Sequence, residues 1–119
     1  MKNIKLFENF DKSSVDKETI KEILYPLTDE YAEVYITDYP DESFILTIKN
    51  INEKTDKKDI NECLDMLVDF LSEYKISHGK VIVNYGAEYQ FPALPILNIM
   101  INNLSVRTII IDFEKIDNK

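Results

Sequence analysis

The sequence predicts a single α/β or α+β domain over residues 1–119, in which helices pack on a mixed sheet of four to five strands. Three observations indicate this fold class: two short alternating segments joined by a turn, one helix with a sustained apolar stripe, and two short apolar segments that alternate with helical ones. A length of 119 residues is usual for one domain, and the hydrophobic fraction of 45% is that of an ordinary globular protein.

The first predicted elements are a short strand and a helix. Residues 3–10 alternate weakly between apolar and polar side chains, which indicates the strand. Ser13 or Ser14 is a suitable N-cap for the helix. Pro26 is expected to end this helix near Leu24 or Tyr25.

An antiparallel hairpin is predicted over residues 31–48. Residues 31–38 and 44–48 both alternate with period two, and the segment between them has the Pro, Asp and Ser residues of a turn. A three-residue loop would place Leu46 opposite Ile36 and Ile48 opposite Val34, with these aliphatic side chains on one face. The other face carries three tyrosines, Tyr31, Tyr35 and Tyr39.

The clearest helix is predicted over residues 57–74, where apolar residues recur every three or four positions. Five acids fall within the opposite third of the helical wheel, and we call them the acidic stripe: Asp59, Glu62, Asp65, Asp69 and Glu73. Like-charged neighbours at these spacings cost about 0.2–0.5 kcal/mol each, so four successive pairs would cost roughly 1–2 kcal/mol. No lysine or arginine lies among them, although a helix selected only for solubility would usually include some.

Two apolar strands are predicted at residues 80–85 and 107–113, separated by a proline-containing loop and a helix over residues 94–104. Because strands and helices alternate here, we expect βαβαβ-type parallel crossovers. Both strands are apolar on both faces, so we expect them at central positions covered by helices on both sides.

From the hairpin onward, over roughly residues 31–113, this order of elements resembles that of STAS domains of the anti-anti-sigma-factor family. The resemblance implies a regulatory protein-interaction module. In that family a phosphorylatable Ser or Thr opens the helix after the central strand. Residues 84–92, with the sequence NYGAEYQFP, contain neither residue, so the regulatory mechanism of the family does not carry over.

Composition limits the kind of partner and the compartment. A net charge of −8 disfavours direct binding to nucleic acid or to an anionic membrane surface. The sequence has no apolar run of transmembrane length and no signal-peptide pattern after Met1, and its single cysteine fits a reducing cytosol, so we expect a cytoplasmic protein. Its two glycines form no phosphate-binding loop, and no cofactor is expected.

No catalytic or metal site is predicted. His78, the only histidine, is interpreted as a solvent-facing residue of a helix-to-strand turn. Cys63 lies on an apolar helix stripe and is expected to be buried and inert. Asp38, Asp41 and Glu42 have the chemistry of a turn and lack the spacing of a calcium loop.

An enzyme interpretation, ranked last, depends on two polar residues near the carboxyl ends of predicted parallel strands. Open sheets of parallel strands place their ligand crevices at that edge. Asn84 and Asp112 would meet there, and with Tyr85, Glu88 and Tyr89 they would line a small pocket.

The distribution of acids is the main indication of function. Residues 29–48 and 59–74 contain no lysine or arginine and hold eleven of the 22 acids, while the other eleven are outnumbered by 14 bases. A patch of one sign is typical of a surface that attracts a partner of the opposite sign. We therefore expect a binding protein that inhibits a basic protein, foremost an immunity protein or antitoxin that masks the positive site of a nuclease-type toxin.

The expected partner contacts are the acidic stripe together with the hairpin tyrosines Tyr31, Tyr35 and Tyr39 and the loop residues Tyr85, Glu88 and Tyr89. A loop folded back over the core is an equally good interpretation of residues 85–95. A phage-type inhibitor of a nucleic-acid-binding enzyme and a STAS-like regulatory module remain alternative functions. The oligomeric state stays open.

Overall fold

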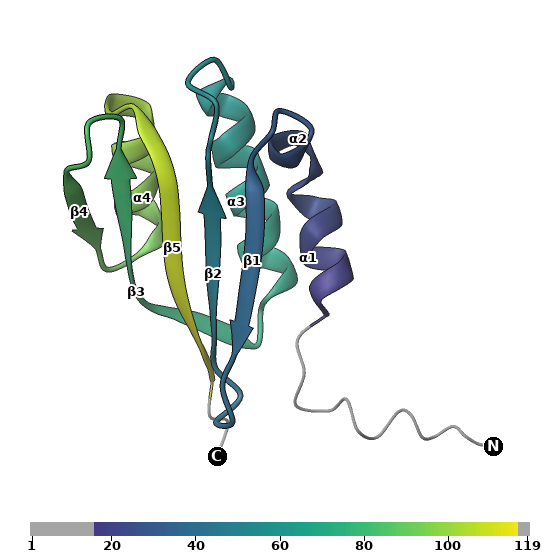
Figure 1. Ribbon diagram of the computed structural model, residues 1–119. Coiled ribbons are helices and arrows are strands. Elements are labelled where there is room, and N and C mark those ends of the chain that lie inside the picture. The colour runs from purple at the N-terminus through teal and green to yellow at the C-terminus, as the bar shows by residue number, and fades with distance from the viewer. Residues whose placement is uncertain (1–15, 117–119) are drawn as a thin grey trace.

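Two hairpins and a C-terminal strand form one five-stranded sheet (Figure 1). The structure is a computed structural model that describes residues 16–116. Strand β1 (Glu33–Asp38) pairs with β2 (Phe44–Lys49), and β3 (Tyr74–Val83) pairs with β4 (Glu88–Phe91). Strand β5 (Val106–Lys115) joins the hairpins by pairing with both β2 and β3, which gives the order β1-β2-β5-β3-β4.

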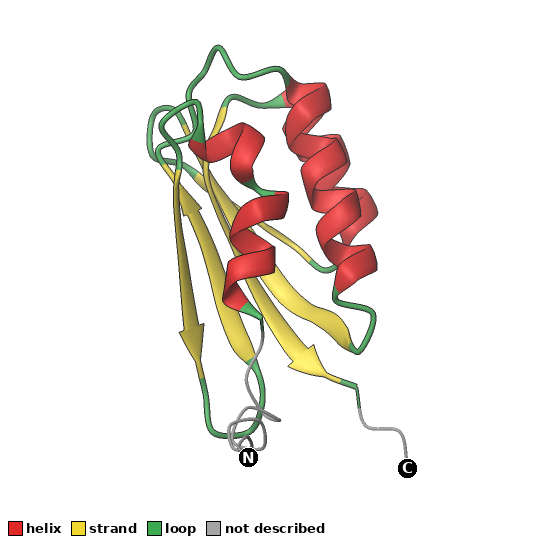
Figure 2. Cartoon of the chain, turned by 90° about the vertical axis from the view of Figure 1, so that its right-hand side faces the viewer, coloured by secondary structure: helices red, strands yellow, loops and turns green. Residues whose placement is uncertain are grey.

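Within residues 16–116, four helices lie on a single face of this sheet, and none of them covers the opposite face, which we call the open face (Figure 2). They are α1 (Lys17–Ile23), α2 (Tyr25–Thr28), α3 (Lys57–Phe70) and α4 (Leu94–Asn103). The described residues therefore form one α+β domain with a helix layer on a sheet.

Burial along the central strands follows this one-sided arrangement. In β2 the residues Phe44, Leu46 and Ile48 are buried under the helices, while Ile45 and Thr47 between them are partly exposed. Strand β5 repeats the pattern, with Ile109, Ile111 and Phe113 buried and Ile110 and Asp112 partly exposed. The alternation is that of an antiparallel sheet with one face toward the core.

The predicted hairpin is confirmed, including its register. Leu46 lies opposite Ile36 and Ile48 opposite Val34. The turn is closed by Asp41, whose carboxylate accepts hydrogen bonds from the backbone N–H of Ser43 at 3.1 Å and from its hydroxyl at 2.5 Å. These bonds, that of the hydroxyl first, lower the pKa of Asp41.

The expected parallel crossovers are wrong, because every neighbouring pair of strands is antiparallel. Strands β2 and β3 do run in the same direction, since both are antiparallel to β5, but β5 lies between them. The physical reason is the additional strand β4, which forms from four residues of a segment that was expected to be a loop. Because β4 reverses the direction of the chain between β3 and α4, β5 runs antiparallel to β3. The expected coverage of the central strands on both faces is likewise not found, since the helices of the described residues cover one face (Figure 2).

Several element boundaries also differ from the expected ones. Helix α3 ends at Phe70, and β3 begins at Tyr74, six residues before the expected strand at residues 80–85. The strand therefore contains His78, which was expected in a turn. Helix α1 ends with Leu24 as its C-cap, close to the expected position, but Pro26 then lies in the first turn of a second short helix, α2.

Two expectations fall on residues that the structure does not describe. The strand at residues 3–10 and the N-cap at Ser13 or Ser14 lie before residue 16. The N-cap of α1 is Asp16, whose carboxylate accepts from the backbone N–H of Thr19 at 3.1 Å. The resemblance to STAS domains rested on the order of the elements alone. The structure does not support it, because the strand β4 and an all-antiparallel sheet take the place of the expected parallel crossovers.

The one-sided core can be tested with two adjacent isoleucines of β5. Ile111 is fully buried beneath the helices, whereas Ile110 lies on the open face. We expect Ile111→Ala to lower the free energy of unfolding by about 2–5 kcal/mol and Ile110→Ala by about 1 kcal/mol, measured by urea denaturation. Equal losses for the two substitutions would contradict a core on one face.

Candidate functional site

The acidic stripe lies on the outer face of α3, directed away from the sheet. Its four helical members, Asp59, Glu62, Asp65 and Asp69, are all exposed. The opposite side of the helix buries its apolar residues against the core: Ile60, Cys63, Leu64 and Leu67. Glu73 lies beyond the end of α3 and is also exposed. The predicted helix face is therefore confirmed for four of the five acids.

Few acids of the stripe are paired with bases. The Glu62 carboxylate lies 3.9 Å from Lys58 Nζ, and the Glu73 carboxylate lies 3.5 Å from Lys115 Nζ. Within residues 16–116, Asp59, Asp65 and Asp69 form no ion pair. Exposed pairs at these distances contribute little, so the stripe keeps a negative field. Because Glu73 has left the helix, three helical neighbour pairs remain, at a cost of roughly 0.6–1.5 kcal/mol.

Helix α4 lies beside α3 and carries no charged side chain. The two helices run antiparallel, since Asn61 near the start of α3 donates to the Asn102 side chain near the end of α4 at 2.9 Å. Lys57 Nζ donates to the backbone carbonyls of Asn102 and Leu104 at 3.4 and 3.3 Å. These carbonyls at the C-terminal end of α4 bind a base that lies close to the start of the stripe.

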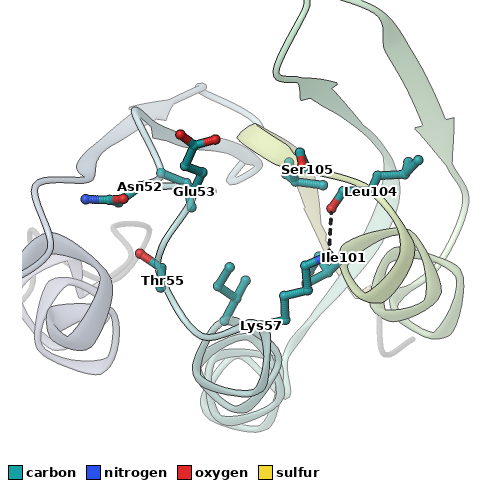
Figure 3. A pocket seen from close by; sticks show the side chains of 10 residues that line it. Asn52, Glu53, Thr55, Lys57, Ile101, Leu104 and Ser105 are labelled. Carbon is teal, nitrogen blue, oxygen red and sulfur yellow. Dashed lines mark hydrogen bonds between the residues drawn. The ribbon is translucent and has the colours of Figure 1, made fainter.

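Lys57 also crosses a small pocket beside the start of α3 (Figure 3). This pocket is closed by the segment with Asn52 and Thr55 on one side and by Leu104 and Ser105 on the other. Its volume of about 30 Å³ accommodates water but not a molecule of substrate size.

Two large apolar side chains are exposed on the same outer face as the acids. Met66 is 58% exposed and Phe70 is 42% exposed. We call them the apolar pair. Met66 follows Glu62 by four residues and precedes Asp69 by three, so it lies among the acids of the stripe. The sequence prediction did not include them as contact residues, although both fall outside the buried series Ile60, Leu64, Leu67 and Leu71, which is the signal that identifies them.

The open face of the sheet differs from the outer face of α3, because its acids are paired with bases. Between β3 and β5, Lys75 lies 3.7 Å from Glu114 and His78 Nε2 lies 3.0 Å from the Asp112 carboxylate. At the outer edge, Lys80 lies 3.4 Å from Glu88. Acids and bases therefore alternate across these strands, and this face has no stripe of one sign among the described residues.

Tyr35, one of the three tyrosines predicted as anchors, does not share a surface with the stripe. Tyr35 lies on the open face, opposite Thr47, and its hydroxyl donates to Glu33 at 2.6 Å. This hydrogen bond lowers the pKa of Glu33 and raises that of Tyr35. Tyr31 precedes β1, and Tyr39 follows it at the opposite end of that strand.

The loop residues predicted as contacts lie at another margin of the sheet. Tyr85 is exposed in the turn between β3 and β4, and Tyr89 and Glu88 belong to the edge strand β4. The segment expected to be a loop is thus partly a strand of the sheet. Of the predicted contact residues, the structure gathers only Asp59, Glu62, Asp65 and Asp69 on one helix.

Asn84 and Asp112 do not meet in a pocket. Asn84 accepts a hydrogen bond from Arg107 at 3.0 Å, and Arg107 is five residues before Asp112 on β5, about 17 Å along an extended strand. The sequence expectation assumed that β3 and β5 were parallel. Because they are antiparallel, their carboxyl ends lie at opposite edges.

Asp112 instead lies in a small polar cluster on the open face. A register shift of β3 at Ser77 accompanies contacts from Ser77 Oγ to His78 Nδ1 at 3.4 Å and from His78 Nε2 to Asp112 at 3.0 Å. Beside it is a surface hollow of about 110 Å³, whose charged lining residues, Asp112 and Glu114, are both acids. An oxyanion formed in this hollow would be repelled by these carboxylates, so the cluster is poorly arranged for acyl transfer.

Cys63 is buried, as predicted. Its burial, followed by the nearby charges of Asp59 and Glu62, raises the pKa of the thiol, which disfavours the reactive thiolate. Within residues 16–116, no group of three His, Cys, Asp or Glu side chains is placed to hold a metal ion. No helix in this part of the chain is long and apolar enough to cross a bilayer.

Comparison with protein-family models, curated proteins and solved structures finds no match for this chain. Its function is therefore inferred from the residues and their geometry.

The stripe should lower the stability of the free protein, and a single substitution tests this. In Asp69→Lys, the new base lies four residues after Asp65 and close to the C-terminal end of α3, where the helix dipole favours positive charge. We expect the free energy of unfolding at low salt to rise by about 0.5–1 kcal/mol. In the control Glu18→Lys, the new base lies in the first turn of α1, where the helix dipole favours negative charge, and no such gain is expected. A loss of stability in Asp69→Lys would contradict a repulsive stripe.

Proposed function

We propose that this protein inhibits a basic protein by covering its positively charged surface with the outer face of α3. The foremost partner is a nuclease-type toxin, for which this chain would act as the immunity protein or antitoxin. A nuclease binds the phosphate backbone through clustered lysines and arginines. An acidic surface competes for the same cluster and accelerates association by attraction at a distance.

The observation that carries this proposal is the unequal pairing of charge on the two sides of the molecule. Acids on the open sheet face have basic neighbours across the strands, whereas Asp59, Asp65 and Asp69 have none among the described residues. A field confined to one face orients an approaching partner, while evenly spread charge only increases solubility.

The position of the acids along α3 also supports a role in binding. Asp69 lies in the last turn, where the helix dipole disfavours negative charge, and that turn contains no base. Proteins commonly keep surface residues that lower the free energy of unfolding when those residues serve a function. A role of Asp69 in binding would therefore explain its unfavourable position.

Charge reversal provides the test. The variant Glu62→Lys/Asp65→Lys/Asp69→Lys changes the central stripe, and the matched control is Glu18→Lys/Glu22→Lys/Glu30→Lys. Glu18 and Glu22 line a hollow against Val34 of β1 and are exposed, so the control makes the same change in net charge elsewhere. With a partner captured from the native host, we expect the stripe variant to lose affinity by about 100-fold or more and the control to lose less than about tenfold.

The outcomes of this experiment separate the alternatives. Equal losses for the two variants would show that net charge alone acts, and unchanged affinity of the stripe variant would refute the proposal. Where the stripe is required, the captured partner assigns the class: a secreted nuclease toxin indicates an immunity protein, and a host nucleic-acid enzyme indicates a phage-type inhibitor. Binding that depends on the open sheet face would instead favour a regulatory module.

A further inference from the structure

We infer that the apolar pair, Met66 and Phe70, is the anchor of the same interface, so that the partner surface is an apolar recess bordered by lysine and arginine. This inference rests on the proposed function and specifies the chemistry of the partner. It predicts that basic charge alone is insufficient for tight binding.

The geometry places the pair along one side of the stripe. Phe70 follows Met66 by four residues, so their side chains are neighbours on the helix surface. Glu62 and Asp69 lie one turn from Met66 on either side, while the buried Cys63 and Leu67 lie on the core side of the pair. Exposed apolar residues beside charged ones are typical of the residues that dominate protein interfaces.

Core packing does not account for this exposure. The core side of α3 is occupied by Ile60, Cys63, Leu64 and Leu67, all of which are buried, whereas Met66 and Phe70 are 58% and 42% exposed. Phenylalanine supplies a large contact area, and methionine adapts its shape to an irregular recess. Covering both would add apolar burial that long-range attraction cannot supply.

The adjacent acids determine what can occupy this surface. A neutral apolar partner would remove water from Asp65 and Asp69 without replacing their hydrogen bonds, which strongly disfavours such a complex. Lysine or arginine around the recess would satisfy both carboxylates. We therefore expect the acids to control mainly the association rate and the apolar pair mainly the dissociation rate.

Two synthetic helical peptides of equal charge test this chemistry before any partner has been captured. One presents lysines around leucines, and the other presents lysines around alanines. Calorimetry should give affinity about tenfold or more higher for the Lys/Leu peptide, with NMR shift changes on α3. In Met66→Ser/Phe70→Ser this preference should disappear, while weak salt-sensitive binding of both peptides remains. The control Tyr25→Ser, which removes an exposed aromatic beside Glu18 and Glu22, should retain the preference.

The outcomes distinguish this inference from the proposed function. If the double serine variant keeps the leucine preference, the anchor is refuted while the acidic interface stands. If the stripe reversal leaves the binding of both peptides unchanged, the acidic interface itself is refuted. If Phe70→Ser unfolds the chain, the single variant Met66→Ser, at the more exposed of the two positions, replaces the double variant. We expect it to lose part of the preference for the Lys/Leu peptide. Unchanged preference in that folded single variant also refutes the anchor.

Discussion

Every other part of the fold depends on the pairing of β5 with both hairpins. Strands β2 and β3 do not pair with each other, so the sheet is continuous only where β5 lies between them. The strand also supplies Ile109, Ile111 and Phe113 to the centre of the buried face, and Phe113 stacks on Phe44 with ring centroids 5.0 Å apart. Because β5 is the last of these strands along the chain, its pairing with β2 joins residues far apart in sequence. The pairings of β5 with β2 and with β3 thus join the two hairpins into the one sheet on which the helices pack.

The one-sided cover produces two chemically different surfaces. The sheet presents cross-strand ion pairs on its open face, where side chains of adjacent strands lie within reach of one another. The helix layer presents α3, with its unpaired acids and exposed Met66 and Phe70, beside the uncharged α4. Polar bonds from Lys57 and Asn61 hold these two helices together at one end. The helix face proposed to bind the partner is therefore supported by contacts that leave its outer side free.

The sequence predicts local structure well and strand order poorly, for physical reasons. The hairpin register follows from period-two alternation and a turn that Asp41 closes. The outer face of α3 follows from its helical period. Residues 88–91 give no comparable signal, because EYQF has only one buried residue, Phe91, which packs on Gly79 of β3. Without this strand, the sequence predicts the wrong direction for β5 relative to β3. The predicted proximity of Asn84 and Asp112 is wrong for the same reason. The contact between Ser77, His78 and Asp112 depends on a register shift that single-sequence patterns do not encode.

Carboxyl footprinting by mass spectrometry, applied to the free protein and to its complex with the captured partner, tests the central claim most directly. The outer face of α3 is the proposed interface, so complex formation should protect Asp65 and Asp69 from carbodiimide labelling. Glu18 and Glu22, near β1, should label equally in both samples. Continued labelling of Asp65 and Asp69 in the complex, with protection of Glu33 and Glu114 instead, would place the partner on the open face of the sheet and contradict the account.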